Sequence, residues 1–171
     1  QLRSNWITIA WAVEALALLW AGLERKSLKL RVLGCTLFGV ALAKLFFLDT
    51  PWGFSFSTRP MFTPVFNRYF LSSLVVIGCL FAALLLYQRE EQRKQVDAPR
   101  LRVVLLLGAI VTLWFVMSVE TQTFFATRAA AERIAVNAEH QLWLGQMALS
   151  VLWAAYATAL AAVGFARRSA S

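Results

Sequence analysis

Two charged residues stand near the end of an apolar segment, ALAKLFFLDTPWGF at residues 41–54, and are the first candidates for chemistry. Lys44 lies inside the segment and Asp49 lies at its boundary. If the segment crosses a membrane, each charge costs at least about 2.5–3.5 kcal/mol on insertion scales and needs a partner or a function. Residues five apart on an α-helix point about 140° away from each other. We therefore expect that Lys44 and Asp49 do not pair directly.

The candidate partners of these two charges lie in neighbouring segments. Glu14 is the candidate for Lys44, because a short turn would make the first two apolar segments antiparallel neighbours. Alternatively, the lysine side chain extends toward the boundary layer that holds Asp49. For Asp49 the candidates are Arg59 and Arg68 in the loop that follows. A bridge to Arg68 would fix that loop to the start of the next segment.

These charges form a candidate polar cluster on the outer half of a helical bundle, with two interpretations. As a binding site, the cluster would hold an anionic headgroup, a sugar-lipid or an ion, since ionisable groups within membranes often mark such sites. As a structural device, the same charges would lock helices together through ion pairs. The candidate residues are Glu14, Lys44, Asp49, Arg68 and Glu120.

Other chemically active side chains give weaker signals. His140 is the single histidine and lies beside Glu139, which does not make a metal site. Cys35 and Cys79 lie inside apolar segments without metal-ligand spacing, as buried small hydrophobes do. The sequence contains no GxSxG, P-loop or HExxH motif. We therefore expect no cofactor, no metal and no catalytic residue.

The composition is that of a membrane protein. Of the 171 residues, 60% are hydrophobic and only 15% are charged, whereas about a quarter of a soluble domain is charged. The net charge of +8 could indicate nucleic acid binding, but the basic residues cluster between apolar segments, as in cytoplasmic loops. No nucleic-acid-binding motif accompanies them. The expected partner is therefore the lipid bilayer and not nucleic acid.

Five apolar segments are long enough to cross a bilayer, whose core of about 30 Å needs roughly 20 helical residues. Because the backbone must satisfy its own hydrogen bonds in lipid, we expect each segment to be a helix. The predicted fold is an all-α polytopic transmembrane bundle of about five spans. The spans are residues 5–23, 30–48, 69–87, 101–119 and 144–165.

The distribution of Lys and Arg predicts the orientation of these spans. Basic residues concentrate between spans one and two, between spans three and four, and after span five, and these segments alternate so as to share one side. The positive-inside tendency places them in the cytoplasm. The N-terminus is then outside and the C-terminus inside.

Two segments are expected to be outer loops. Residues 50–67 contain three of the four prolines and several phenylalanines, which disfavour a continuous helix. Residues 120–141 are Ala-rich and typical of a helix, but too polar to span, so we expect them to lie on the outer surface.

An internal similarity relates the first span to the fifth. Residues 11–27, WAVEALALLWAGLERKS, align without gaps on residues 153–169, WAAYATALAAVGFARRS, so that Trp, Ala, Leu, Gly, a basic pair and Ser recur in step. Parallel repeats are one way in which polytopic proteins are built. We expect residues 1–143 to form a four-span repeat and residues 144–171 to form the first span of a following repeat, in a longer repeat array that continues beyond Ser171.

The order of motifs resembles a known family. A first span with W-x-x-x-A-L, a basic turn with LR-x-LG, then KLFFLD and NRYFLSSLVVIGCLFAALLLYQR are similar to a family of large bacterial membrane proteins, the domain of unknown function twenty-three thirty-nine. The resemblance covers roughly residues 6–88 and restarts near residue 149, and Glu14 stands where the second copy has Tyr156. It implies an inner-membrane location and no established activity. The residues on the family pattern are Lys44, Asp49, Arg68, Gly78 and Tyr87.

Three functions are compatible with these patterns. We favour a non-enzymatic scaffold or assembly component of the cell envelope, which would contact lipid, envelope proteins or lipid-linked precursors. The first alternative is a transporter or flippase for a lipid or sugar precursor that uses the polar cluster. The second is an outward-facing transferase on a lipid-linked substrate, with Asp49 as base. A transporter needs a water-accessible cavity and an enzyme needs an outer cleft, whereas a scaffold needs its charges to be paired.

Overall fold

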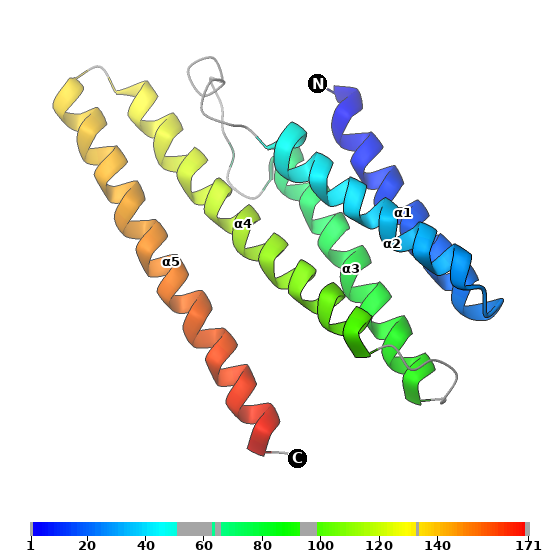
Figure 1. Cartoon of the computed structure of the whole chain (residues 1–171). Coiled ribbons are helices and arrows are strands. Elements are labelled where there is room, and N and C mark those ends of the chain that lie inside the picture. The colour runs from blue at the N-terminus through cyan, green and yellow to red at the C-terminus, as the bar shows by residue number, and fades with distance from the viewer. Residues whose placement is uncertain (1, 51–62, 64–65, 93–98, 133, 170–171) are drawn as a thin grey trace. The chain divides into compact units, whose positions relative to one another are not determined.

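All regular structure in the described part of the chain is helical. The computed structural model describes residues 2–50, 63, 66–92, 99–132 and 134–169. These residues form five α-helices, labelled in Figure 1, and one π-helical turn that follows α2. They are α1 (Leu2–Glu24), α2 (Leu28–Lys44), η1 (Leu45–Asp49), α3 (Arg68–Gln92), α4 (Pro99–Ala131) and α5 (Ala135–Ser169).

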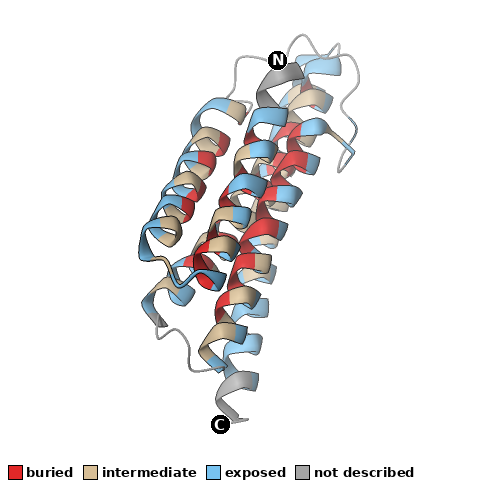
Figure 2. Ribbon diagram, turned by 90° about the vertical axis from the view of Figure 1, so that its right-hand side faces the viewer, coloured by how far each residue is buried: buried red, intermediate tan, exposed pale blue. Residues whose placement is uncertain are grey.

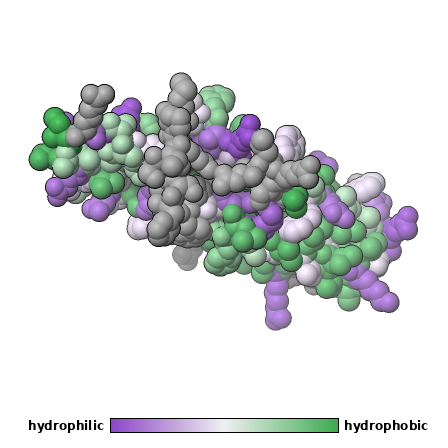
Figure 3. Space-filling view, turned by 90° about the horizontal axis from the view of Figure 1, so that it is seen from above, coloured by the Kyte–Doolittle hydropathy of each residue, from purple (hydrophilic) through white to green (hydrophobic). Residues whose placement is uncertain are grey.

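The helices have the length and the surface of membrane-spanning segments. In the described residues, α1, α2 continued by η1, α3, α4 and α5 are each long and apolar enough to cross a bilayer, which confirms the all-α prediction and is consistent with a multi-pass membrane protein. Large apolar side chains are exposed on all five, including Phe47 at 73% and Val151 at 69% exposure. Apolar side chains are also prominent on the face that Figure 3 shows. Such a surface is stable against lipid and not against water.

The chain divides into two compact units, each described by itself. Of the described residues, the first contains 2–50, 66–92 and 99–113, and the second contains 63, 114–132 and 134–169. In the first unit, α1 packs against both α2 and α3. Buried residues form stripes along these helices (Figure 2). On α1 the stripe is Thr8, Ala12, Ala15 and Leu19, at the spacing of three to four residues that one helix face requires.

Two glycines allow α1 and α2 to approach closely. A Cβ atom on Gly22 would lie 2.9 Å from Cγ of Arg31, and one on Gly34 would lie 2.9 Å from Cγ of Leu19. Both distances are shorter than van der Waals contact permits, so a larger residue would push the helices apart. Small residues at such positions are a general device of helix packing in membranes.

The turn between α1 and α2 is closed by backbone hydrogen bonds. The amide of Ser27 donates to the carbonyl of Gly22 at 3.0 Å, and the amide of Lys26 donates to Leu23 at 3.1 Å. This pair of bonds is a Schellman motif, with Lys26 in the left-handed conformation at φ 51°. Arg31 Nε donates to the same Gly22 carbonyl at 3.0 Å, which ties the start of α2 to the end of α1.

Helix α3 begins at a side-chain cap. The amide of Phe70 donates to Oδ1 of Asn67 at 2.8 Å, which satisfies one of the free amides of the first turn. One turn further on, the buried hydroxyls of Ser72 and Ser73 donate to the carbonyl of Tyr69 at 2.9 and 2.7 Å. Their polar atoms are therefore satisfied within the helix.

In the second unit, aromatic side chains join α4 to α5. The indole Nε1 of Trp153 donates to Oγ of Ser118 at 3.0 Å, and its ring lies 5.5 Å from that of Trp114 between centroids. Gly145 of α5 faces Phe125, because a Cβ atom there would lie 2.9 Å from Cβ of Phe125. This side of α5 is the one that packs on α4.

The expected outer segment of residues 120–141 is helical, but not as a separate surface helix. Its first part extends α4 to Ala131, and its last part belongs to α5, which begins at Ala135. Ala, Glu and Arg are strong helix formers, and this segment contains no Gly or Pro. Both helices are therefore longer than the minimum length needed to cross a membrane. Most of the other expected loop, residues 50–67, lies outside the described residues, and so does Arg59.

Candidate functional site

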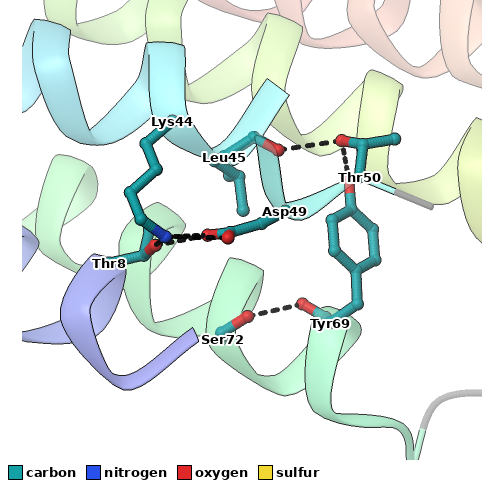
Figure 4. A network of polar contacts seen from close by, with 7 residues as sticks. All are labelled: Thr8, Lys44, Leu45, Asp49, Thr50, Tyr69 and Ser72. Atoms are coloured by element: carbon teal, nitrogen blue, oxygen red, sulfur yellow. Dashed lines mark hydrogen bonds and ion pairs between the residues drawn. The ribbon is translucent and has the colours of Figure 1, made fainter. Parts of the chain in front are cut away.

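Lys44 and Asp49 form a direct ion pair, which corrects the expectation that they would not meet. The Nζ atom of Lys44 donates to Oδ1 of Asp49 at 2.7 Å and to Oδ2 at 2.9 Å (Figure 4). The expectation assumed a uniform α-helix through both residues. The helix changes at Leu45 into the π-helical turn η1, which ends at Asp49.

The π-helical turn explains the pair geometrically. Its hydrogen bonds join residues five apart instead of four, so that residues with this separation come to the same side of the helix. Thr50 closes the turn by donating from Oγ1 to the carbonyl of Leu45 at 2.8 Å. The same hydroxyl lies 3.2 Å from the hydroxyl of Tyr69 on α3. The turn is thereby fixed to a second helix (Figure 4).

Thr8 of α1 is the third member of the site, and it is not among the candidates predicted from the sequence. Lys44 donates to Oγ1 of Thr8 at 2.7 Å, and the same hydroxyl donates to Oδ2 of Asp49. One signal could have indicated Thr8. It precedes the turn residue Lys26 by as many residues as Lys44 follows it, so that an antiparallel pair of helices places the two side by side.

The ion pair is buried. The Asp49 side chain is 0% exposed and that of Lys44 is 10% exposed. Removing two charges from water costs several kcal/mol for each, and only good geometry with further hydrogen bonds offsets this cost. Thr8 provides those hydrogen bonds from a neighbouring helix. The three residues, Thr8, Lys44 and Asp49, are called the buried ion-pair cluster below.

Of the remaining candidates of the predicted polar cluster, Glu14 and Arg68 do not join the ion pair, and Glu120 belongs to the other compact unit. Glu14 is exposed on α1, about 9 Å along the axis and about 120° round the helix from Thr8. Arg68 is exposed at the first residue of α3, and within the described chain it makes no ion pair with Asp49. Glu120 is buried at 8% exposure on the part of α4 that belongs to the second unit.

Elsewhere in the described residues, no three His, Cys, Asp or Glu side chains gather where they could hold a metal. His140 is exposed and its ring lies parallel to that of Trp143, with 6.2 Å between centroids. Cys35 is half-buried and Cys79 is buried, and both are free thiols. Among the candidate residues that the structure describes, Lys44 and Asp49 are thus the two that form an ion pair with each other.

The fold and the cluster define a class of protein: a helical chain whose five long apolar segments are consistent with a multi-pass membrane protein, with a charged pair at the end of the second segment. The chain matches no family model, and comparison with curated proteins and solved structures finds no similar chain. The resemblance to the domain of unknown function twenty-three thirty-nine therefore stays a prediction.

Proposed function

We propose that this chain is a non-enzymatic scaffold or assembly component of the inner membrane. The observation that carries the proposal is the closed geometry of the buried ion-pair cluster. Lys44 directs Nζ to both carboxylate oxygens of Asp49 and to the hydroxyl of Thr8. These interactions join α1 to the end of α2. A charged group that is held in this way stabilises helix packing, as a scaffold requires.

The proposed orientation has the N-terminus outside and the C-terminus inside. Arg25, Lys26 and Lys29 are exposed at the turn between α1 and α2, where the positive-inside tendency favours the cytoplasm. The buried ion-pair cluster is then in the outer half of the bundle. The proposal also includes a larger array of parallel repeats, which the similarity of residues 11–27 to residues 153–169 supports.

One observation favours the alternative of a transporter or flippase. Isolated π-helical turns occur frequently at functional sites, and η1 carries the charged pair. In this alternative, transport would require the pair to open toward a substrate. The transferase alternative has no such support, because the side chain of Asp49 is fully buried and paired with Lys44.

A charge-neutralising cycle tests the structural role. We expect Lys44→Met and Asp49→Asn each to lower the free energy of unfolding by about 3–5 kcal/mol, because each leaves the other charge buried without its partner. The double variant should recover most of this loss. The measurement is thermal and denaturant unfolding in mild detergent. The matched control is the exposed pair of Arg102 and Glu91, which are 2.7 Å apart. Neutralising either or both of these residues should change the free energy of unfolding by less than about 1 kcal/mol.

A vesicle assay separates the scaffold from the transporter. The parent chain and the Lys44→Met/Asp49→Asn double variant are reconstituted in liposomes, and the exchange of fluorescent phospholipids between leaflets is measured. If the protein is a scaffold, lipid exchange with the parent chain and with the double variant should be no faster than in vesicles without protein. Lipid exchange that the parent catalyses and the double variant loses, although it folds, would instead establish the flippase alternative. Recovery of stability by the double variant is then the control for folding.

A further inference from the structure

Helix α5 repeats the residue pattern of α1, and the correspondence extends to the buried ion-pair cluster. With residues 11–27 aligned on residues 153–169, the residue that corresponds to Thr8 is Ser150, which also carries a hydroxyl. Ala15 corresponds to Ala157, and Gly22 to Gly164. The structure therefore permits a comparison of one helix face in two surroundings.

On α1, this face is covered by α2 and η1. The hydroxyl of Thr8 contacts Lys44 and Asp49. A Cβ atom on Gly34 would lie 3.0 Å from the carbonyl oxygen of Ala15, and one on Gly22 would lie 2.9 Å from the backbone nitrogen of Arg31. This face of α1 is thus in close contact with α2 and η1 from Gly22, beside the basic turn, to Thr8, beside the ion pair.

On α5, the corresponding face is open in the described structure. Ser150, Ala157, Ala161 and Gly164 are all exposed, and a Cβ atom added to Gly164 would meet no atom within 4 Å. These residues lie about 100–160° round the helix from Gly145, where α5 packs on Phe125 of α4. Trp153, the other residue of α5 that contacts α4, lies about 80° round from Gly145. The face therefore begins beside the contact with α4 and turns away from it toward Ala161.

We propose that this face of α5 docks a transmembrane helix with the chemistry of α2, as the scaffold function proposed above requires. The occupant has a basic residue that reaches the carbonyl of Gly164, as Arg31 reaches Gly22. It presents a small residue opposite Ala157 and a polar or charged group at the level of Ser150. The same residue of the occupant also faces Ala161, as Gly34 faces both Ala15 and Leu19 on α1. Because Ala161 is smaller than Leu19, this small residue is larger than the glycine found at Gly34.

The first step of the test uses α2 itself as the probe. A synthetic peptide of residues 27–50 with Gly34→Cys and Cys35→Ala is added to the full chain in lipid nanodiscs. The chain carries Cys35→Ala and Cys79→Ala, with Ala161→Cys as the reporter of the proposed face. Ala155→Cys is the matched control, since it is equally an exposed alanine on α5 and corresponds to Val13, which is exposed on α1.

We expect disulfide formation with the peptide to favour Ala161→Cys over Ala155→Cys by at least about tenfold, which corresponds to 1.4 kcal/mol of preference. Gly164→Leu should abolish this preference, because it fills the space that the basic residue of the occupant needs. The same substitution should leave the unfolding of the chain alone unchanged, since Gly164 has open space around it.

Three results would overturn the docking proposal. They are equal linkage at both positions, linkage that Gly164→Leu does not alter, and links between two chains through Ala161→Cys that exceed those to the peptide. The last result would mean that a second copy covers this face. None of the three depends on lipid exchange, so failure of docking and failure of the scaffold function are distinguishable.

Discussion

At the scale of single residues, the site depends on a hydroxyl that carries no charge. Thr8 is fully buried and its Oγ1 contacts both members of the ion pair. It accepts from the ammonium of Lys44 and donates to the carboxylate of Asp49, so that one small side chain serves two charges of opposite sign.

Replacing Thr8 with valine tests this role, because valine keeps the shape and removes the hydroxyl. We expect Thr8→Val to lower the free energy of unfolding by about 1–3 kcal/mol, the range for removing one hydrogen-bond partner from buried polar groups. The matched control is Thr36→Val. Thr36 is exposed and bonds its own helix at Val32, 2.9 Å away, so its change should stay within about 0.5 kcal/mol. Equal effects at the two positions, measured by denaturant unfolding in detergent, would contradict the role of Thr8.

At the scale of secondary-structure elements, the turn between α1 and α2 contains a residue in an unfavourable conformation. Lys26 has φ 51°, a region that glycine adopts freely and other residues adopt at a cost of roughly 1–2 kcal/mol. The turn is nevertheless closed by the Schellman hydrogen bonds to Gly22 and Leu23. A lysine at this position is consistent with a need for positive charge beside the membrane.

Exchanging this lysine for glycine should therefore stabilise the protein. We expect Lys26→Gly to raise the free energy of unfolding by about 0.5–1 kcal/mol, since relief of the left-handed strain exceeds the entropy cost of glycine. Lys29→Gly removes the same charge from the first turn of α2 and should destabilise by about 0.5 kcal/mol. Thermal unfolding of the two variants distinguishes an effect of backbone conformation from an effect of charge. A pure charge effect would change the free energy of unfolding of both variants in the same direction.

The extent of prediction from the sequence differs between elements and site. Each of the five expected spans lies within a helix or, for the second, within α2 and η1 together, because apolar length is a direct requirement of the bilayer. The C-terminal end of α4 and the N-terminal end of α5 were not predicted, because the bilayer sets only a minimum length for a spanning helix. The pairing of Lys44 with Asp49 was not predicted, because a π-helical turn has no sequence signature. That both charges need partners could be predicted, because they lie in apolar surroundings.

At the scale of the whole molecule, exposed apolar side chains on every helix indicate that lipid is the solvent. The proposed orientation follows from the basic residues alone and can be tested independently of function. Lys29 is exposed at the start of α2, and Phe66 is exposed shortly before α3. The orientation places the first position inside and the second outside.

Cysteine labelling measures this orientation. In a chain with Cys35→Ala and Cys79→Ala, we expect a membrane-impermeant maleimide to label Phe66→Cys in intact cells and to leave Lys29→Cys unlabelled until the cells are permeabilised. The physical reason is that translocating a basic turn across the bilayer is disfavoured. Labelling of Lys29→Cys in intact cells would reverse the proposed orientation and would move the buried ion-pair cluster to the cytoplasmic half.

The π-helical turn also has a consequence for how this chain could vary during evolution. On an uninterrupted α-helix, residues four apart lie on one face, so a lysine and an aspartate separated by three residues could form the pair that Lys44 and Asp49 form across four. Loss of one residue between them would convert η1 to α-helix and keep the contact. In an alignment, such a deletion within a transmembrane span would look disruptive, yet it would preserve the site.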